Sequence, residues 1–224
     1  MNKKSVHDRI IEIGVVPVVR ASSARDALVA AGAVAEGGIP VVEITMTVPG
    51  ALDVIRELAR SNSSSVLIGA GTVLDCETAK RCVDAGAEFL VSPALNLETI
   101  EFAGKQNLLM IAGALTPTEV VQAWRAGSDF VKVFPCGPVG GARYIKALKG
   151  PLPQIPLVPT GGVNLTTAAE FLEAGADALG VGGELVATDA LKSGRREVIV
   201  DAASKFAAIV KATRNRLAPT ARAL

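Results

Sequence analysis

The chain has 224 residues, half of them hydrophobic and only 4% aromatic, a composition typical of a protein with a large aliphatic core. The 23 Lys and Arg side chains nearly balance the 22 Asp and Glu side chains, so no field of one sign indicates a nucleic acid or a membrane surface as partner. Three cysteines, Cys76, Cys82 and Cys136, lack the spacing of a metal site and predict reduced thiols. Charged residues interrupt the N-terminal segment where an export signal would lie, so we expect a soluble, cytoplasmic protein.

Apolar, β-branched runs alternate with segments of helical periodicity along the whole chain. Strands are expected over residues 15–20, 41–45, 66–70, 89–92, 108–112, 129–135, 156–160 and 178–181. Helices are expected over 4–13, 24–36, 51–60, 77–85, 97–105, 118–126, 142–149, 166–174 and 196–214, and residues 217–224 are expected to fray. Eight strand–helix units preceded by an extra helix predict a single-domain (β/α)8 TIM barrel over residues 1–224, with an open doubly wound sheet as the alternative.

The sixth expected strand carries a lysine, Lys132, among apolar and aromatic residues. Because alternate side chains of a strand point to the same face, Lys132 shares its face with Phe130 and Phe134. Removing an ammonium group from water favours the neutral amine, so we predict a lowered pKa for Lys132. A neutral lysine amine attacks carbonyl carbon and forms a Schiff base. The alternative is a lysine whose stem packs at the strand end while its charge reaches water.

Polar residues gather where the expected strands end, and the carboxyl ends of the strands carry the chemistry in this fold. Glu43 lies inside an otherwise apolar strand, and the second and sixth strands face each other across an eight-stranded barrel. We therefore expect Glu43 and Lys132 to meet near the barrel axis, either as a catalytic pair or as a structural ion pair. The only histidine, His7, falls in the leading helix, so no metal is expected at the strand ends.

Glycine pairs follow the seventh and eighth expected strands, Gly161-Gly162 and Gly182-Gly183. Backbone N–H groups at such pairs approach an anion closely, and this fold commonly binds phosphate at these two loops. Glu184 comes directly after the second pair, and we expect no lysine or arginine beside either pair. A carboxylate beside a phosphate is repulsive, so the loops leave open whether the ligand is phosphorylated.

Five motifs together carry a family resemblance: residues 43–49 (EITMTVP), 69–73 (GAGTV), 91–93 (VSP), 132–135 (KVFP) and 159–163 (PTGGV). Over about residues 8–212 the chain resembles the class I aldolases for 2-keto-3-deoxy-6-phosphogluconate (KDPG) and 4-hydroxy-2-oxoglutarate (KHG). The resemblance implies a homotrimer without cofactor that cleaves KDPG to pyruvate and glyceraldehyde 3-phosphate. KHG or an unphosphorylated sugar acid are alternative substrates, because relatives often carry serine where this chain has Glu184.

The resemblance also implies roles for single residues. Lys132 would be the Schiff-base lysine, Glu43 the general acid and base, and Arg20 and Thr72 would engage the substrate's carboxylate end. Residues at the carboxyl ends of the expected strands complete the set of candidate substrate-binding residues. The set is Arg20, Thr72, Pro93, Phe134, Thr160, Gly161, Gly162, Gly182 and Gly183. Two rival functions remain open: a phosphosugar isomerase or epimerase with Glu43 as base, and a metabolite-binding barrel without turnover.

Overall fold

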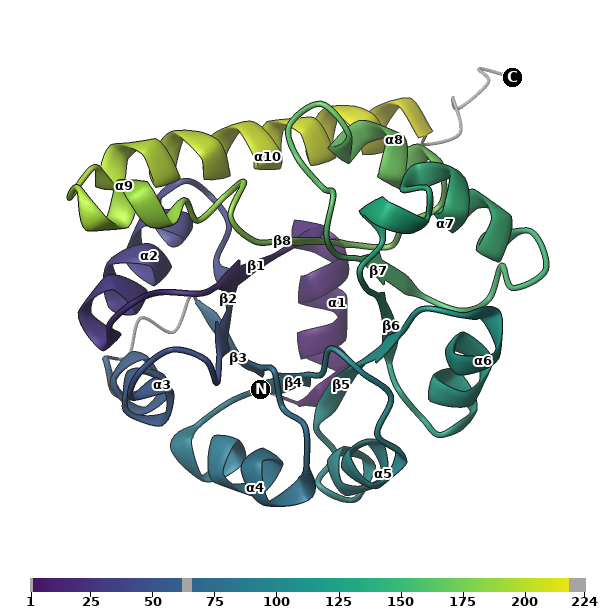
Figure 1. Ribbon diagram of the computed structural model, residues 1–224, viewed down its shortest axis with the longest axis horizontal. Coiled ribbons are helices and arrows are strands. Elements are labelled where there is room, and N and C mark those ends of the chain that lie inside the picture. Colours follow the sequence, from purple (N-terminus) through teal and green to yellow (C-terminus); the bar gives the residue numbers. More distant parts are fainter. Residues whose placement is uncertain (1, 62–65, 218–224) are drawn as a thin grey trace, which may run out of the picture.

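Eight parallel strands form one sheet in the computed structural model, which describes residues 2–61 and 66–217. The sheet order is β7-β6-β5-β4-β3-β2-β1-β8, and a bridge between Thr160 and Gly180 brings the two edge strands together into a barrel (Figure 1). The predicted (β/α)8 fold is confirmed. The strands are β1 (Val15–Val19), β2 (Val41–Thr45), β3 (Leu67–Gly71), β4 (Phe89–Val91), β5 (Leu109–Ala114), β6 (Phe130–Val133), β7 (Leu157–Pro159) and β8 (Leu179–Val181).

Helices surround the barrel on its outside (Figure 1). They are α2 (Ala24–Glu36), α3 (Ala51–Arg60), α4 (Cys76–Ala85), α5 (Leu97–Lys105), α6 (Pro117–Arg125), α7 (Ala142–Lys149), α8 (Ala168–Glu173), α9 (Thr188–Lys192) and α10 (Arg196–Leu217). None of the described helices has the length and apolar character needed to cross a membrane.

The predicted elements all appear, with ends that differ by at most three residues. Helix α8 starts later than predicted because Asn164 Oδ1 accepts hydrogen bonds from the backbone of Thr166 and Thr167, which holds these residues in a turn. The sequence analysis did not predict α9 or the 3-10 turn η1 (Gly137–Val139). Both segments are too short to show helical periodicity in the sequence. The fraying expected at 217–224 falls, beyond Leu217, outside the described residues.

Helix α1 (Lys3–Ile13) closes the end of the barrel where the strands begin, and Figure 1 shows it across the ring of strands. The Asn2 side chain caps its start, and Gly14 ends it with a left-handed φ of 72°. The His7 ring stacks on Phe130 with 4.7 Å between ring centroids, and Lys3 pairs with Asp129 at 3.0 Å. These contacts join α1 to the start of β6, the strand that carries Lys132.

Glycines on the inner face of the sheet make room for larger groups. In the strand register Gly69 lies beside Glu43, and Gly113 lies beside Lys132. A Cβ atom on Gly69 would lie 2.2 Å from the Phe89 ring, and one on Gly113 would lie 2.2 Å from the backbone carbon of Pro93. The loop after β4 therefore folds over the barrel mouth only because residue 113 has no side chain.

Replacing Gly113 should consequently disrupt the barrel mouth. In Gly113→Ala the new methyl group meets backbone rather than a movable side chain, so we expect a loss of about 1–3 kcal/mol in unfolding free energy. The matched control is Gly32→Ala in α2, where a Cβ meets nothing within 4 Å and alanine should add about 1 kcal/mol. Chemical denaturation of both variants measures this, and a Gly113→Ala protein as stable as the parent would contradict the packing.

Candidate active site

The structure brings Lys132 and Glu43 together inside the barrel, as the opposed strands β6 and β2 predict. Lys132 Nζ lies 3.8 Å from Glu43 Oε1, and the two side chains are only 3% and 2% exposed. A separation of 3.8 Å is an ion-pair distance and exceeds that of a hydrogen bond. The two groups therefore do not use their hydrogen-bonding capacity on each other.

The Glu43 carboxyl group is in an unusual electrostatic state. Burial raises its pKa above the ordinary range for glutamate, while the charges of Lys132 and Arg20 act in the opposite direction. Its Oε1 atom is buried and has no hydrogen-bond partner among the described residues. Buried carboxylate oxygens are rarely left without a partner, so this atom suits a water or a substrate hydroxyl placed between Glu43 and Lys132. A raised pKa also suits a carboxyl group that must both take and return a proton near neutral pH.

Gly71 at the end of β3 makes room for this carboxyl group. A Cβ atom on Gly71 would lie 1.9 Å from Glu43 Oε1 and 2.4 Å from its carboxyl carbon. The sequence places Gly71 in the GAGTV motif of residues 69–73, but we predicted no role for it at the site. The signal was the spacing of Gly69 and Gly71, which places two residues without side chains on one face of a buried strand.

The aromatic neighbour predicted for Lys132 is present. The Phe134 ring centroid lies 5.4 Å from Lys132 Nζ, within the range of a cation–π contact. Gly161 lies against this ring, since a Cβ atom on Gly161 would be 3.7 Å from Phe134 Cδ2. Phe134 therefore connects the lysine to the loop after β7.

Arg20 and Thr72 directly follow the carboxyl ends of β1 and β3, the two strands that flank β2. Arg20 directly follows β1 and is exposed, and its charge acts to lower the pKa of Glu43 against the larger effect of burial. Thr72 directly follows β3 with a φ of 59°, an uncommon and strained conformation for a β-branched residue. Strain of this kind concentrates at functional sites.

The glycine loops close the other side of the mouth. Thr160 is buried, and both Gly161 and Gly162 have φ of 84°, which a residue with a side chain rarely adopts. Gly162 lies against Gly137, where a Cβ atom on Gly162 would be 2.8 Å from the Gly137 Cα. The backbone at this loop is thus exposed to a ligand from the mouth rather than shielded by side chains.

The expectation that no cation lies beside the glycine pairs is wrong. Arg20 Nη1 is 4.0 Å from the position of a Cβ atom on Gly182, and Arg143 lines a cavity of about 400 Å³ together with Gly162. Closure of the barrel pairs β1 with β8 and so brings Arg20, which follows β1, near Gly182. Helix α7 carries Arg143 to the loop after β7, which contains Gly162. Both contacts join residues that are distant in sequence, so the sequence alone does not predict them. Glu184 is exposed in the turn after Gly183.

No three His, Cys, Asp or Glu side chains gather as a metal site within residues 2–61 and 66–217. The arrangement offers instead an amine and a carboxyl group buried inside the barrel, with an exposed arginine at the end of β1. An amine in such a place can form an imine with a ketone, and the carboxyl group can move the protons that the reaction requires.

The family model for KDPG and KHG aldolases matches residues 6–202. The chain belongs to this family. A 2-dehydro-3-deoxy-phosphogluconate aldolase of Haemophilus influenzae is 36% identical over 169 residues, which cover 75% of this chain and 79% of that protein. The KHG/KDPG aldolase of Escherichia coli K12 is 33% identical over 86% of this chain and 91% of its own length. The predicted family is confirmed, and the protein is an aldolase, a lyase.

Solved structures of the family agree in fold and in chemistry. A KDPG aldolase from Legionella pneumophila, captured with pyruvate as a covalent carbinolamine, has a TM-score of 0.81 and 30% identity. The similarity covers 88% of this chain and 96% of that one. In that relative, therefore, pyruvate is bound covalently on the way to a Schiff base.

Gly71→Ala should displace the Glu43 carboxyl group while leaving the barrel folded, since the methyl group meets the flexible end of a side chain. A crystal structure should show the separation from Lys132 Nζ increased beyond 3.8 Å. If Glu43 is the general acid and base expected from the sequence, aldol cleavage should slow by about two to four orders of magnitude.

The matched control is Gly104→Ala on α5, where a Cβ atom meets nothing within 4 Å and activity should be unchanged. A Gly71→Ala enzyme with full activity and an unmoved Glu43 would contradict this account of the site.

Proposed function

We propose that this aldolase cleaves KDPG to pyruvate and glyceraldehyde 3-phosphate, with Lys132 as the Schiff-base lysine and Glu43 as the general acid and base. The observation that supports these roles is the buried pair itself, an amine and a carboxyl group 3.8 Å apart at the barrel mouth. Relatives named for this substrate are 32–37% identical to the chain, which supports the choice of KDPG.

The first half of the proposed reaction forms the electron sink. The Lys132 amine attacks the C2 ketone of the substrate, and loss of water from the carbinolamine gives an iminium ion. Glu43 moves protons in these steps, directly or through the water that its unpartnered oxygen suits. The carbinolamine captured in the Legionella relative supports this sequence.

The second half breaks the carbon–carbon bond. Glu43 takes the proton of the C4 hydroxyl, the C3–C4 electron pair moves into the iminium ion, and the aldehyde leaves. The remaining enamine takes a proton at C3, and water then hydrolyses the imine to release pyruvate and restore the amine. Every proton and electron pair is accounted for by the substrate, water, Lys132 and Glu43.

The remaining candidates bind the two ends of the substrate in this proposal. Arg20 and Thr72 hold the carboxylate of the keto acid, supported by the position of Arg20 within electrostatic reach of Glu43. Gly161, Gly162, Gly182 and Gly183 receive the phosphate through backbone N–H groups, while Thr160, Pro93 and Phe134 shape the wall between the ends. Arg143, which lines a cavity with Gly162, supplies a cation to oppose the repulsion from Glu184.

A cytoplasmic homotrimer, built from chains that are each a single domain, completes the proposal. A designed cage made by fusing symmetric oligomeric domains resembles this chain, with a TM-score of 0.83 and 28% identity over 92% of this chain and 75% of that one. That likeness supports an oligomer of this fold. Light scattering after size-exclusion chromatography tests the assembly, and a monomeric mass would reject it.

Borohydride reduction in the presence of pyruvate should attach a reduced three-carbon group to Lys132, and Lys132→Ala should abolish both this labelling and the aldolase activity. Peptide mass spectrometry locates the label. The matched control is Lys146→Ala, which removes an exposed lysine of α7 and should leave labelling intact. A label that maps to Lys146 or Lys149, or that survives in Lys132→Ala, would refute the assignment; an isomerase or a simple metabolite-binding barrel would gain no label.

Comparison of kcat/KM for KDPG, its unphosphorylated analogue and KHG tests the phosphate. We expect KDPG to be preferred, and Glu184→Ser to raise kcat/KM about fivefold for KDPG alone, because the change removes a carboxylate–phosphate repulsion of about 1 kcal/mol in total. Glu57→Ser, an exposed carboxylate on α3, serves as the control and should change nothing. Equal turnover of the unphosphorylated analogue would reject phosphate recognition.

A further inference from the structure

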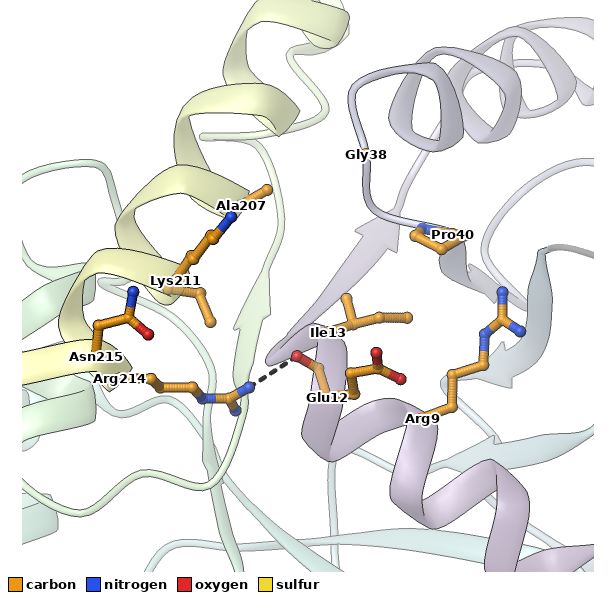
Figure 2. Close-up of a pocket in the computed structure, with 10 residues that line it drawn as sticks. Arg9, Glu12, Ile13, Gly38, Pro40, Ala207, Lys211, Arg214 and Asn215 are labelled. Carbon is orange, nitrogen blue, oxygen red and sulfur yellow. Dashed lines mark hydrogen bonds between the residues drawn. The ribbon is translucent and has the colours of Figure 1, made fainter. Parts of the chain in front are cut away.

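A second cavity lies at the opposite end of the barrel from Lys132, between α1, α10 and the segment before β2 (Figure 2). Its volume is about 600 Å³, a size suited to a small-molecule ligand. The polar groups that line it come from two helices far apart in sequence. They are Arg9 and Glu12 from α1, and Lys211, Arg214 and Asn215 from α10, with Pro40 on the wall.

Arg214 is held in place by neutral partners. Its Nη1 donates to the backbone carbonyl of Glu12 at 2.8 Å, seen as the dashed line in Figure 2, and its Nη2 donates to the carbonyl of Asp177 at 3.0 Å. Gly14 makes room for it, because a Cβ atom there would lie 2.7 Å from Nη2. The guanidinium is therefore preorganised at the cavity rather than free to move in solvent.

The charge of Arg214 is not balanced by an ion pair within the described residues. The nearby Asp177 carboxylate accepts hydrogen bonds from Lys149 Nζ and the Leu157 N–H, both at 2.9 Å. Burial lowers the pKa of Arg214, and the charge of Asp177 only partly offsets this effect. The two bonds to carbonyls use two of the five N–H donors of the guanidinium.

The cavity as a whole carries an excess of positive charge. Even with Arg9 left out of the count, the cations Lys211 and Arg214 outnumber Glu12, the one carboxylate among the lining side chains, so positive charge is in excess. A phosphate monoester near neutral pH carries close to two negative charges and oxygens that match a guanidinium fork. Glu12 and Asn215 can accept hydrogen bonds from hydroxyl groups beside such a phosphate.

We propose that this cavity binds a small hydroxylated phosphate monoester, at a site separate from the active site. The ligand would bridge α1 and α10 through Arg9, Lys211 and Arg214. Helix α1 closes the barrel at the start of β6, the strand that carries Lys132. A ligand bound in the cavity would therefore stabilise the packing of α1 against the barrel. The proposal rests on the cavity alone and does not depend on the substrate proposed above.

Glycerol 3-phosphate is the probe for the test. Titrated into ¹⁵N-labelled protein, it should shift the amide resonances of Gly38, Lys211 and Asn215 in a saturable way. Lys211→Glu should weaken this binding at least tenfold, and Arg9→Gln should weaken it as well, while aldolase activity remains unchanged. The matched control is Lys205→Glu, an exposed lysine of α10 paired with Asp201 outside the cavity, which should retain the parent affinity.

Three outcomes would overturn the proposal: no saturable shifts at the cavity amides, equal weakening by Lys205→Glu and Lys211→Glu, or equal binding of inorganic phosphate and glycerol 3-phosphate. The last result would show a general anion effect without recognition of hydroxyl groups. Borohydride labelling of Lys132 is read separately, so failure at the cavity and failure of the proposed aldolase mechanism are distinguishable.

Discussion

The site depends on one interaction, an amine and a carboxyl group that are kept together inside an apolar barrel. Removing either charge from water is costly, and a partner at 3.8 Å offsets only part of that cost. The pKa of Glu43 is therefore raised, and its oxygen is left without a hydrogen bond. These features are unfavourable for stability alone, and they are the features that covalent imine chemistry uses.

The barrel accommodates this pair by omitting side chains around it. Gly71 admits the Glu43 carboxyl group, Gly113 admits the loop after β4, and Gly180 admits Thr160, whose hydroxyl lies 2.1 Å from the position of a Cβ atom there. Each glycine lies in or beside a strand whose remaining residues are buried aliphatic groups. The interior around the pair is thus close-packed, because atoms of neighbouring strands and loops fill the space that each glycine leaves.

The barrel has two unlike ends. At one end α1 closes the interior through the contact of His7 with Phe130 and the pair of Lys3 with Asp129. At the other end the loops present backbone and a few polar side chains. Phe130 and Lys132 are two residues apart on one face of β6, so the strand that carries Lys132 is also the strand against which α1 packs.

The sequence by itself determined the order of the elements, the family, and the pairing of Lys132 with Glu43, because each rests on local periodicity, on motifs, or on the symmetry of an eight-stranded barrel. Reasoning along the chain predicted no role for Gly71 or Arg143 and did not place Arg20 beside Gly182. Their importance comes from contacts between elements that are distant in sequence: β2 with β3, α7 with the loop after β7, and β1 with β8. Alternation along one strand predicts the face to which a side chain points. Only the tertiary structure decides which atoms of other strands and helices fill the space in front of it.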